Sequence, residues 1–343
     1  MNLIPTIVSA ILSVAVWLYF RLSFRRHFVI HYNLNNGWAW FFDFFIIFST
    51  MFRFLSRTNF KGGWFTALTL TSNTLLGFFG FIALILLALD GVSFLKFLRK
   101  KYLLKNQEIK NPGKDENAFS RRNFLKSNFT VATVAGSGII TGVGFVNSFD
   151  PKIVPVNIPL AENHSHLKGL KIVQLSDMHI GPVLKADFVK LLVEKVNALN
   201  PDIVVITGDI IDGQVENIAE DLIPLKELKS KHGTFFTTGN HEYYWNSREW
   251  SDYISSLGIK VLNNENVQLT HNDSPFYLAG VTDISSTKYD QKNPYDPAKA
   301  IEGIPVNAYK ILMSHQPKTC FLTSKLKYDV QLSGHTHGGQ GFP

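Results

Sequence analysis

The chain reads Ile203-Val204-Val205-Ile206-Thr207-Gly208-Asp209 near its centre, an apolar run that ends abruptly in a glycine and a carboxylate. Apolar side chains without alternation are typical of a strand that is buried on both faces. Similar runs recur between residues 171 and 332. They lie at 171–175, 234–237, 276–279, 310–313 and 329–332. We therefore expect a sheet of short, buried strands in this half of the chain.

Helical patterns separate the early strands. Residues 184–199 place apolar side chains at 188, 191, 192, 196 and 199, which is the spacing of one helix face. Residues 217–228 and 247–257 are weaker candidates. Strands that alternate with helices predict an α/β domain, and ligands of such domains gather at the carboxyl ends of the strands.

Polar clusters follow five of the predicted strands, each at the strand's carboxyl end, and most contain a glycine that lets the backbone turn sharply. They are Ser176-Asp177-Met178-His179, Gly208-Asp209-Ile210-Ile211-Asp212-Gly213, Gly239-Asn240-His241-Glu242, Ser314-His315-Gln316 and Gly334-His335-Thr336-His337-Gly338-Gly339. A single histidine at a strand end is more often structural than functional. Five strand ends thus present Asp, Asn and His side chains, and five such clusters in order are unlikely to arise by coincidence.

In this order, D-x-H, GD-x-x-D, GNHE, a single His and GHTH resemble the calcineurin-like metallophosphoesterase superfamily over residues 169–340. The form GHTHGGQ, together with apolar N-terminal segments, is most similar to its transmembrane and twin-arginine-exported members. The resemblance implies a four-layer α-β-β-α sandwich at residues 151–343, preceded by an all-α transmembrane region.

The resemblance also implies two metal ions, divalent or trivalent, that share one carboxylate. Carried over by motif, one ion takes Asp177, His179, Asp209 and His337, and the other takes Asp209, Asn240, His315 and His335. Sets that mix histidine with carboxylate suit Mn, Fe, Zn or Ni, and the choice among them stays open.

The implied reaction is hydrolysis of a phosphate mono- or diester by a hydroxide held between the metals. His241 is expected to stabilise the transition state or to protonate the leaving group. Asp212 and Glu242 either orient His241 or a metal ligand, or have a purely structural role. Asp283 is a candidate accessory residue. Loops 243–248 and 284–296 are expected to select the substrate.

Four other histidines are expected outside the site. His164 and His166 precede the first strand without a matching carboxylate, His232 adjoins the turn at Gly233, and His271 adjoins the polar turn 272–275. The single cysteine excludes an internal disulfide and a cysteine-rich zinc module.

The N-terminal part is strongly apolar and predicts several membrane spans. Residues 3–22, 38–54 and 64–95 are candidates for three transmembrane helices within 1–105. Asp43 and Asp90 interrupt two of these runs, and we expect both at helix ends rather than in an ion pathway.

Residues 106–150 combine a hydrophilic connector at 106–117 with a further apolar segment at 129–146. Between them lies Ser120-Arg121-Arg122-Asn123-Phe124-Leu125-Lys126, which is similar to a twin-arginine export signal. An ordinary fourth span with basic flanks explains the same residues, and the two interpretations are compatible. We expect the segment to be retained as an anchor.

The charge distribution indicates membrane orientation instead of nucleic-acid binding. Residues 1–150 hold 16 basic and 6 acidic side chains, whereas residues 151–343 hold 18 and 21. Ten of the basic side chains lie between residues 96 and 126, which predicts a cytoplasmic segment. A span after it would place the catalytic domain outside the cytoplasm, at a bacterial inner or plasma membrane.

The leading function is thus a membrane-anchored phosphoesterase with a lipid-linked or envelope substrate. A lipid A enzyme of the UDP-2,3-diacylglucosamine pyrophosphate hydrolase kind is an alternative, although it would need cytoplasmic access. A non-catalytic metal-binding sensor is a second alternative. A transporter is disfavoured because the spans show no paired charges. The chain stops soon after His337, which predicts a truncated domain or a different closure of the fold. Substrate, native metals and oligomeric state stay open.

Overall fold

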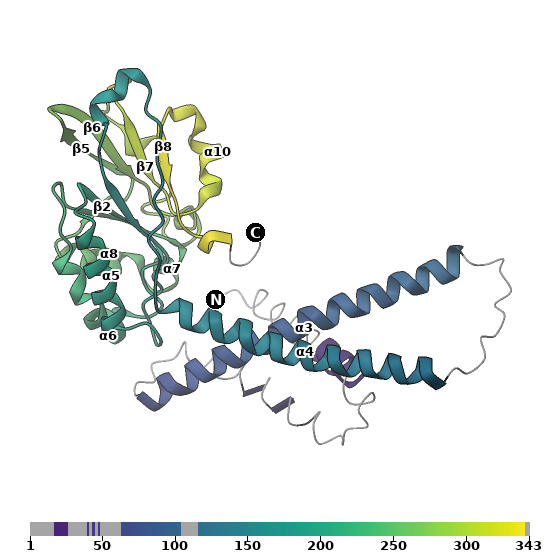
Figure 1. The fold of residues 1–343 in the computed structure, drawn as a ribbon. Coiled ribbons are helices and arrows are strands. Elements are labelled where there is room, and N and C mark those ends of the chain that lie inside the picture. Colours follow the sequence, from purple (N-terminus) through teal and green to yellow (C-terminus); the bar gives the residue numbers. More distant parts are fainter. Residues whose placement is uncertain are drawn as a thin grey trace. The chain divides into compact units, whose positions relative to one another are not determined.

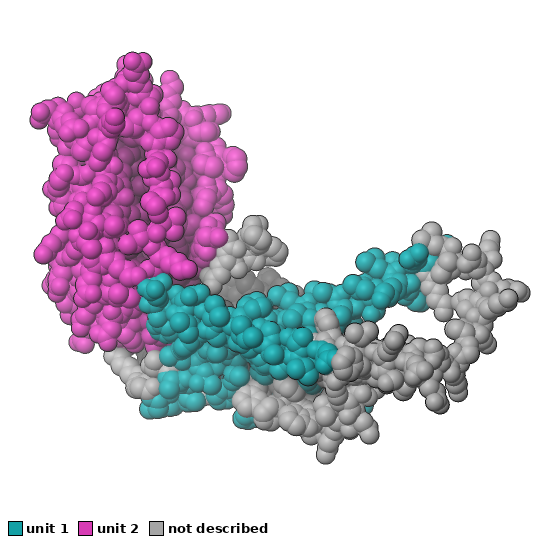
Figure 2. All heavy atoms as spheres, in the orientation of Figure 1, with its two compact units in different colours: residues 1–150 teal, residues 151–343 magenta. Residues whose placement is uncertain are grey.

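The computed structural model describes residues 17–26, 40, 43–44, 47–48, 63–103 and 116–339. The chain divides into two compact units, Met1–Asp150 and Pro151–Pro343 (Figure 2). Most of the candidate spans at 3–22 and 38–54, and most of the connector at 106–117, lie outside the described residues.

The N-terminal unit contains two long helices, α3 (Gly63–Leu103) and α4 (Glu116–Ser148). Ala67–Arg99 and Val131–Ser148 are long and apolar enough to cross a membrane. The segment similar to a twin-arginine signal lies inside α4, whose helix continues without interruption into the apolar stretch.

Small hydroxyl side chains are buried along both helices, which contact each other and cross at an angle (Figure 1). Thr69 and Ser72 on α3, like Thr133 and Ser137 on α4, are at most 5% exposed. Small residues of this kind let two helix backbones approach closely within a membrane.

Asp90 lies inside α3 and not at a helix end, so that expectation is wrong. Its carboxylate accepts hydrogen bonds from Tyr19 Oη (3.1 Å), Ser23 Oγ (2.6 Å) and an Arg26 guanidinium nitrogen (3.1 Å). The helical residues 17–26 are therefore tied to α3 by a charged pair as well as by apolar contacts.

A second ion pair joins Arg21 Nε to a carboxylate oxygen of Asp43 at 3.4 Å, and Trp17 Nε1 donates to the same carboxylate at 3.2 Å. The expectation that the apolar part holds no paired charges is therefore also wrong. Sequence spacing did not show these pairs because their members are far apart in the chain.

The C-terminal unit is built on two four-stranded sheets (Figure 1). The first is wholly parallel, in the order β1 (Ile172–Leu175), β2 (Ile203–Thr207), β3 (Thr234–Thr237) and β4 (Lys260–Val261). The second has the order β5 (Glu265–His271), β6 (Ser274–Gly280), β7 (Lys310–Met313) and β8 (Val330–Leu332). Only the β5–β6 pair of the second sheet is antiparallel. In the first sheet, Ile172 of β1 pairs with Ile203 of β2, and Val204 of β2 pairs with Thr234 of β3.

Helices connect these strands. The α-helices are α5 (Ala186–Ala198), α6 (Val215–Ile218), α7 (Asn240–Tyr244), α8 (Ser247–Ser256), α9 (Ser286–Tyr289) and α10 (Cys320–Thr323). The 3-10 segments are η2 (Glu162–Leu167), η3 (Ala219–Glu227), η4 (Lys299–Ile301), η5 (Pro317–Thr319), η6 (Ser324–Leu326) and η7 (His337–Gly339). The helix expected at 217–228 is split between α6 and η3 at Ile218, whose φ of −133° and ψ of 0° are not helical. Pro224 lies inside η3 and has no N–H for a regular helix.

Strand β2 is buried on both faces, as its apolar run predicts. Val204 and Ile206 join the cluster formed with α5, η3 and α8, whereas Ile203 and Val205 join the cluster between the two sheets. Successive side chains of a strand point to opposite faces, so one run of residues contributes to both clusters. The two sheets therefore pack face to face, with helices on the outer face of the first.

Strands β4 and β5 were missed in the sequence. Strand β5 pairs with β6 through a hairpin whose turn residues Asn272 and Asp273 have positive φ of 47° and 57°. Two consecutive positive φ angles are typical of a type I′ turn. His271, assigned to the turn region, is in fact the last residue of β5.

Candidate metal centre

The carboxyl ends of parallel strands bring the five polar clusters together. Asp177 and His179 follow β1, Asp209 and Asp212 follow β2, and α7 begins directly after β3. His315 follows β7, and the last cluster follows β8. The predicted metal ligands from the two sheets thus meet at one edge of the domain.

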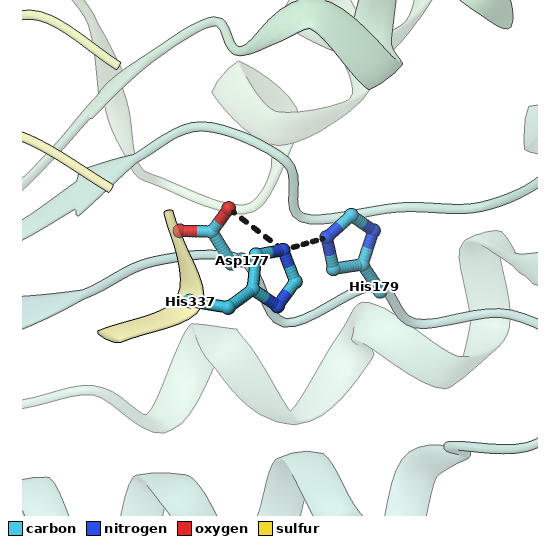
Figure 3. Close-up of side chains that lie close together, drawn as sticks. All are labelled: Asp177, His179 and His337. Carbon is cyan, nitrogen blue, oxygen red and sulfur yellow. Dashed lines mark hydrogen bonds and ion pairs between the residues drawn. The ribbon is translucent and has the colours of Figure 1, made fainter. Parts of the chain in front are cut away.

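The first group consists of Asp177, His179 and His337, whose side chains converge in Figure 3. His337 Nε2 lies 3.4 Å from Asp177 Oδ1 and 3.2 Å from His179 Nε2. Their ligand atoms all lie within 4.8 Å of one another, which is close enough to share one cation.

The second group consists of Asp209, His315 and His335. His315 Nε2 lies 3.1 Å from Asp209 Oδ2. Asn240 is 7% exposed, and the N–H of the next residue, His241, donates to Asp209 Oδ1 at 2.8 Å. The buried Oδ1 of Asn240 has no hydrogen-bond partner. Buried polar atoms are rarely left unpaired, so this oxygen fits a metal ion as its partner.

Asp209 lies between the two groups. Its Oδ2 is 3.1 Å from His315 Nε2, 4.0 Å from His179 Nε2 and 3.9 Å from His241 Nε2. Burial raises the pKa of this carboxyl. The hydrogen bond and charge of His315, together with the N–H of His241, lower the pKa by more than burial raises it, so the net pKa is below its usual value. An ionised, buried carboxylate in this position suits a bridging ligand.

The ligand histidines are oriented through their second ring nitrogen. His315 Nδ1 donates to the carbonyl oxygen of Thr207 at 2.7 Å, and His179 Nδ1 lies 3.2 Å from Asp212 Oδ2. Both contacts leave Nε2 free for a cation, which is the usual arrangement of metal-binding histidines. Burial lowers the pKa of His315, but Asp209 raises it to about 9, so a cation would displace a proton there.

Asp212 joins His241 to the metal ligands. His241 Nδ1 lies 2.5 Å from Asp212 Oδ1, while the other oxygen faces His179. Burial raises the pKa of Asp212, yet its hydrogen bonds with both histidines lower it to about 2. For His241, burial lowers the pKa and Asp212 raises it more strongly, so the net pKa is above the usual value.

Glu242 contacts the backbone of the site instead of His241. Its carboxylate accepts hydrogen bonds from the N–H groups of Gly239 (2.6 Å), Asp209 (3.0 Å) and Ile210 (2.9 Å). Burial and the charge of Asp209 raise the pKa of Glu242 to about 7, although the hydrogen bonds from the backbone N–H groups lower it. Glu242 therefore fixes the loop that carries Asp209.

Five of the seven predicted metal ligands have a left-handed backbone. The φ angles are 54° at Asp177, 46° at His179, 52° at Asp209, 70° at His335 and 48° at His337. Each such residue costs on the order of 1 kcal/mol, and such residues cluster at functional sites. The surrounding fold holds these side chains in an orientation that relaxed backbone would not give.

Of the remaining candidates, Asp283 contacts a neighbour of a predicted ligand, and four histidines do not belong to the site. Asp283 is 2% exposed, and its Oδ1 accepts a hydrogen bond from Nε2 of Gln316, the residue after His315, at 3.0 Å. The other carboxylate oxygen of Asp283, Oδ2, has no hydrogen-bond partner. Histidines 164, 166, 232 and 271 belong to none of the ligand groups found in the described residues.

Two contributors were not singled out in the sequence. The Thr207 carbonyl acts through its backbone, which no residue type reveals. The ring of Tyr244 lies 5.1 Å from the ring of His241, centroid to centroid. Its position one helical turn after Asn240 in α7 was the available signal, because residues four apart share a helix face.

Gly239→Ala tests the packing around Asp209. Any Cβ at Gly239 would collide with the Asp209 carboxylate and its amide, although the φ of −98° at Gly239 suits alanine. We expect the affinity for Mn²⁺ to fall about tenfold or more, measured by calorimetric titration. Gly303→Ala is the control, since it costs backbone strain but meets no neighbour. Equal affinities in the two variants would contradict the steric argument.

Comparison with known proteins places this centre in a family. Residues 170–339 match the family model described as Calcineurin-like phosphoesterase. The chain is 35% identical over 222 residues to a "Transmembrane protein with metallophosphoesterase domain" from Danio rerio, covering 62% of this chain and 51% of that protein. It is 38% identical over 227 residues to an "Uncharacterized metallophosphoesterase" from Helicobacter pylori, covering 65% and 58%.

An "Uncharacterized metallophosphoesterase" from Aquifex aeolicus is 34% identical over 171 residues, covering 50% of this chain and 64% of that protein. The chain thus spans about half the length of the first two of these relatives. The family model and the relatives' names agree on a hydrolase of phosphoric esters. Residues 170–339 therefore belong to the calcineurin-like phosphoesterase family.

Proposed function

We propose that this chain is a membrane-anchored phosphoesterase with a dinuclear metal centre. The position of Asp209 carries the proposal, since one carboxylate oxygen lies within 4.0 Å of histidine nitrogens from both ligand groups. One ion takes Asp177, His179, Asp209 and His337, and the other takes Asp209, Asn240, His315 and His335. The donor set of histidine, carboxylate and amide suits Mn, Fe, Zn or Ni.

The four-layer sandwich is part of the same proposal. Two features support it: the face-to-face packing of the sheets, and the apolar cluster on the outer face of the second sheet. That cluster joins Ala279 and Leu312 to Ala300 of η4. Helices would then cover both outer faces, with the metal centre at the carboxyl ends of the strands.

When bound, two metal ions supply an acidified water and neutralise charge that develops on a phosphoryl group. His241 acts beside them: Asp212 holds Nδ1, so Nε2 faces Asp209 at 3.9 Å. From there Nε2 is placed to donate a proton to the leaving oxygen or to stabilise the charged transition state. The complete ligand set favours catalysis over a sensor that only binds metal.

Anchoring by α3 and α4 favours an ester carried by a lipid or by the cell envelope. The helix α4 runs unbroken through the twin-arginine-like segment and buries Thr133 and Ser137, which supports a retained span. The ten basic side chains between residues 96 and 126 support a cytoplasmic connection between the two helices. The catalytic unit would then lie outside the cytoplasm, where a substrate of the lipid A pathway made inside the cell is not accessible.

The single cysteine allows a direct test of this topology. Cys320 is exposed on the catalytic unit, and the chain has no other cysteine. We expect a membrane-impermeant maleimide to label the protein in intact spheroplasts, because the proposed topology has Cys320 outside the cytoplasm. Cys320→Ser is the control for specific labelling, and Lys110→Cys in that background should label only after permeabilisation. Labelling of Cys320 only after permeabilisation would reverse the topology.

Hydrolysis of bis(p-nitrophenyl) phosphate and of p-nitrophenyl phosphate tests the activity itself. We expect the detergent-solubilised chain to need Mn²⁺ and Asp209→Asn to lose at least about a thousandfold in kcat/KM, because both ligand groups lose their shared charge. The ratio of the two rates shows whether diesters or monoesters are preferred. A folded, metal-loaded protein without activity on either ester would favour a binding role.

His241→Ala separates catalysis from metal binding. We expect kcat to fall about 100-fold or more, as for a lost general acid, while two equivalents of bound metal remain. Metal content by elemental analysis is the second measurement. His232→Ala is a matched control, because His232 belongs to none of the ligand groups in the described residues. Parallel loss of metal and turnover in His241→Ala would make it a ligand instead.

A further inference from the structure

A hollow of about 310 Å³ opens beside the metal centre. Its lining residues are Gln214, Glu216, Tyr244, Trp245, Asn246 and Glu249. Tyr244 belongs to both places, since its ring lies 5.1 Å from the ring of His241. An ester held at the metal centre would therefore extend its organic group past Tyr244 into this hollow.

The walls of the hollow are fixed by buried and paired groups. Trp250 is fully buried, and its Nε1 donates to the carbonyl oxygen of Gly213 at 3.0 Å, directly before Gln214. Arg248 binds both carboxylate oxygens of Asp290, at 2.7 Å and 3.3 Å. These contacts hold together two loops that were expected to select the substrate, and a preorganised wall costs less to order when a ligand binds.

Tyr244 lines the side of the hollow nearest His241. Its ring meets the ring of Tyr289 edge to face, with the centroids 6.0 Å apart, and the two residues come from the two loops that Arg248 and Asp290 join. They are 54% and 51% exposed. Half-exposed aromatic rings offer a large apolar surface at small entropic cost, and such rings are enriched where a ligand covers them.

The polar lining suits hydroxyl groups. Glu216 and Glu249 are acceptors, whereas the carboxamides of Gln214 and Asn246 donate and accept. The hollow has neither lysine nor arginine among its lining residues, so a second phosphate would find no cation there. Asn246 Nδ2 already donates to Glu249 Oε2 at 2.9 Å. An ammonium group would satisfy the carboxylates but would leave the carboxamide donor of Gln214 without a role.

We propose that this hollow binds a sugar or polyol, the organic group of a phosphate ester whose phosphorus lies at the metal centre. The proposal deepens the phosphoesterase function and rests on it. Tyr244 packs against the C–H face of the bound group, and the carboxamides and carboxylates bind its hydroxyls. Tyr244 and Gln214 are then specificity-determining residues.

Three diesters with a common p-nitrophenyl group test the proposal, with glyceryl, methyl and choline as the second substituent. We expect the Mn²⁺-loaded full chain in detergent to prefer the glyceryl over the methyl ester by about tenfold or more in kcat/KM. Tyr244→Ala and Gln214→Ala should bring that ratio close to one, with manganese content unchanged. Phe321→Ala removes an aromatic ring that is 81% exposed on α10, and it should keep the wild-type ratio.

The outcomes distinguish failure of the polyol site from failure of the phosphoesterase function. Hydrolysis of none of the three esters would remove the phosphoesterase function itself. Equal rates on the glyceryl and methyl esters, or a ratio that survives Tyr244→Ala, would overturn the polyol site while leaving that function intact. A preference for the choline ester would assign the hollow to an ammonium group instead.

Discussion

The arrangement of the site in the C-terminal, catalytic unit (Pro151–Pro343) depends on one buried carboxylate, that of Asp209. Its side chain lies between two groups of histidines, and its own backbone amide is held by Glu242. Gly239 has no side chain because the Asp209 carboxylate occupies that space. The strand β2 ends at this point, so the sheet, the glycine and the glutamate all serve to place one oxygen where two cations could share it.

This arrangement is costly without a cation. Asp209, Glu242 and Asp283 are each at most 2% exposed, and the ion pairs of the site's carboxylates among the described residues are all with histidine. Buried charges without full compensation destabilise a fold by several kcal/mol. Left-handed backbone at five ligands adds to that cost. A bound metal ion would compensate the buried negative charge and would give Asn240 Oδ1 a partner. The affinity for metal and the stability of the unit are then linked.

The sequence predicted the parts of the fold that are local in the chain. The bounds of β2, β3 and β7 agree with the apolar runs, because apolar side chains fill the centre of a strand that is buried on both faces and polar residues stand at its ends. Strand β5 was missed, since its pattern is half-polar and its partner is fixed by a turn of two non-glycine residues with positive φ. The left-handed ligands and the Thr207 carbonyl were not visible either. They depend on tertiary contacts that residue type does not encode.

The two units solve the same electrostatic problem in different ways. In the N-terminal unit, acidic groups among apolar helices are matched by arginines, as Arg26 matches Asp90 and Arg21 matches Asp43. Such pairs need no outside ligand, and the Arg26–Asp90 pair ties residues 17–26 to α3. At the predicted metal centre, the ion pairs of the carboxylates among the described residues are with histidines, which titrate near neutral pH and bind metals as neutral rings. Histidine in place of arginine leaves ring nitrogens that can bind a cation, so the carboxylate–histidine groups suit metal binding and the carboxylate–arginine pairs suit a purely structural role.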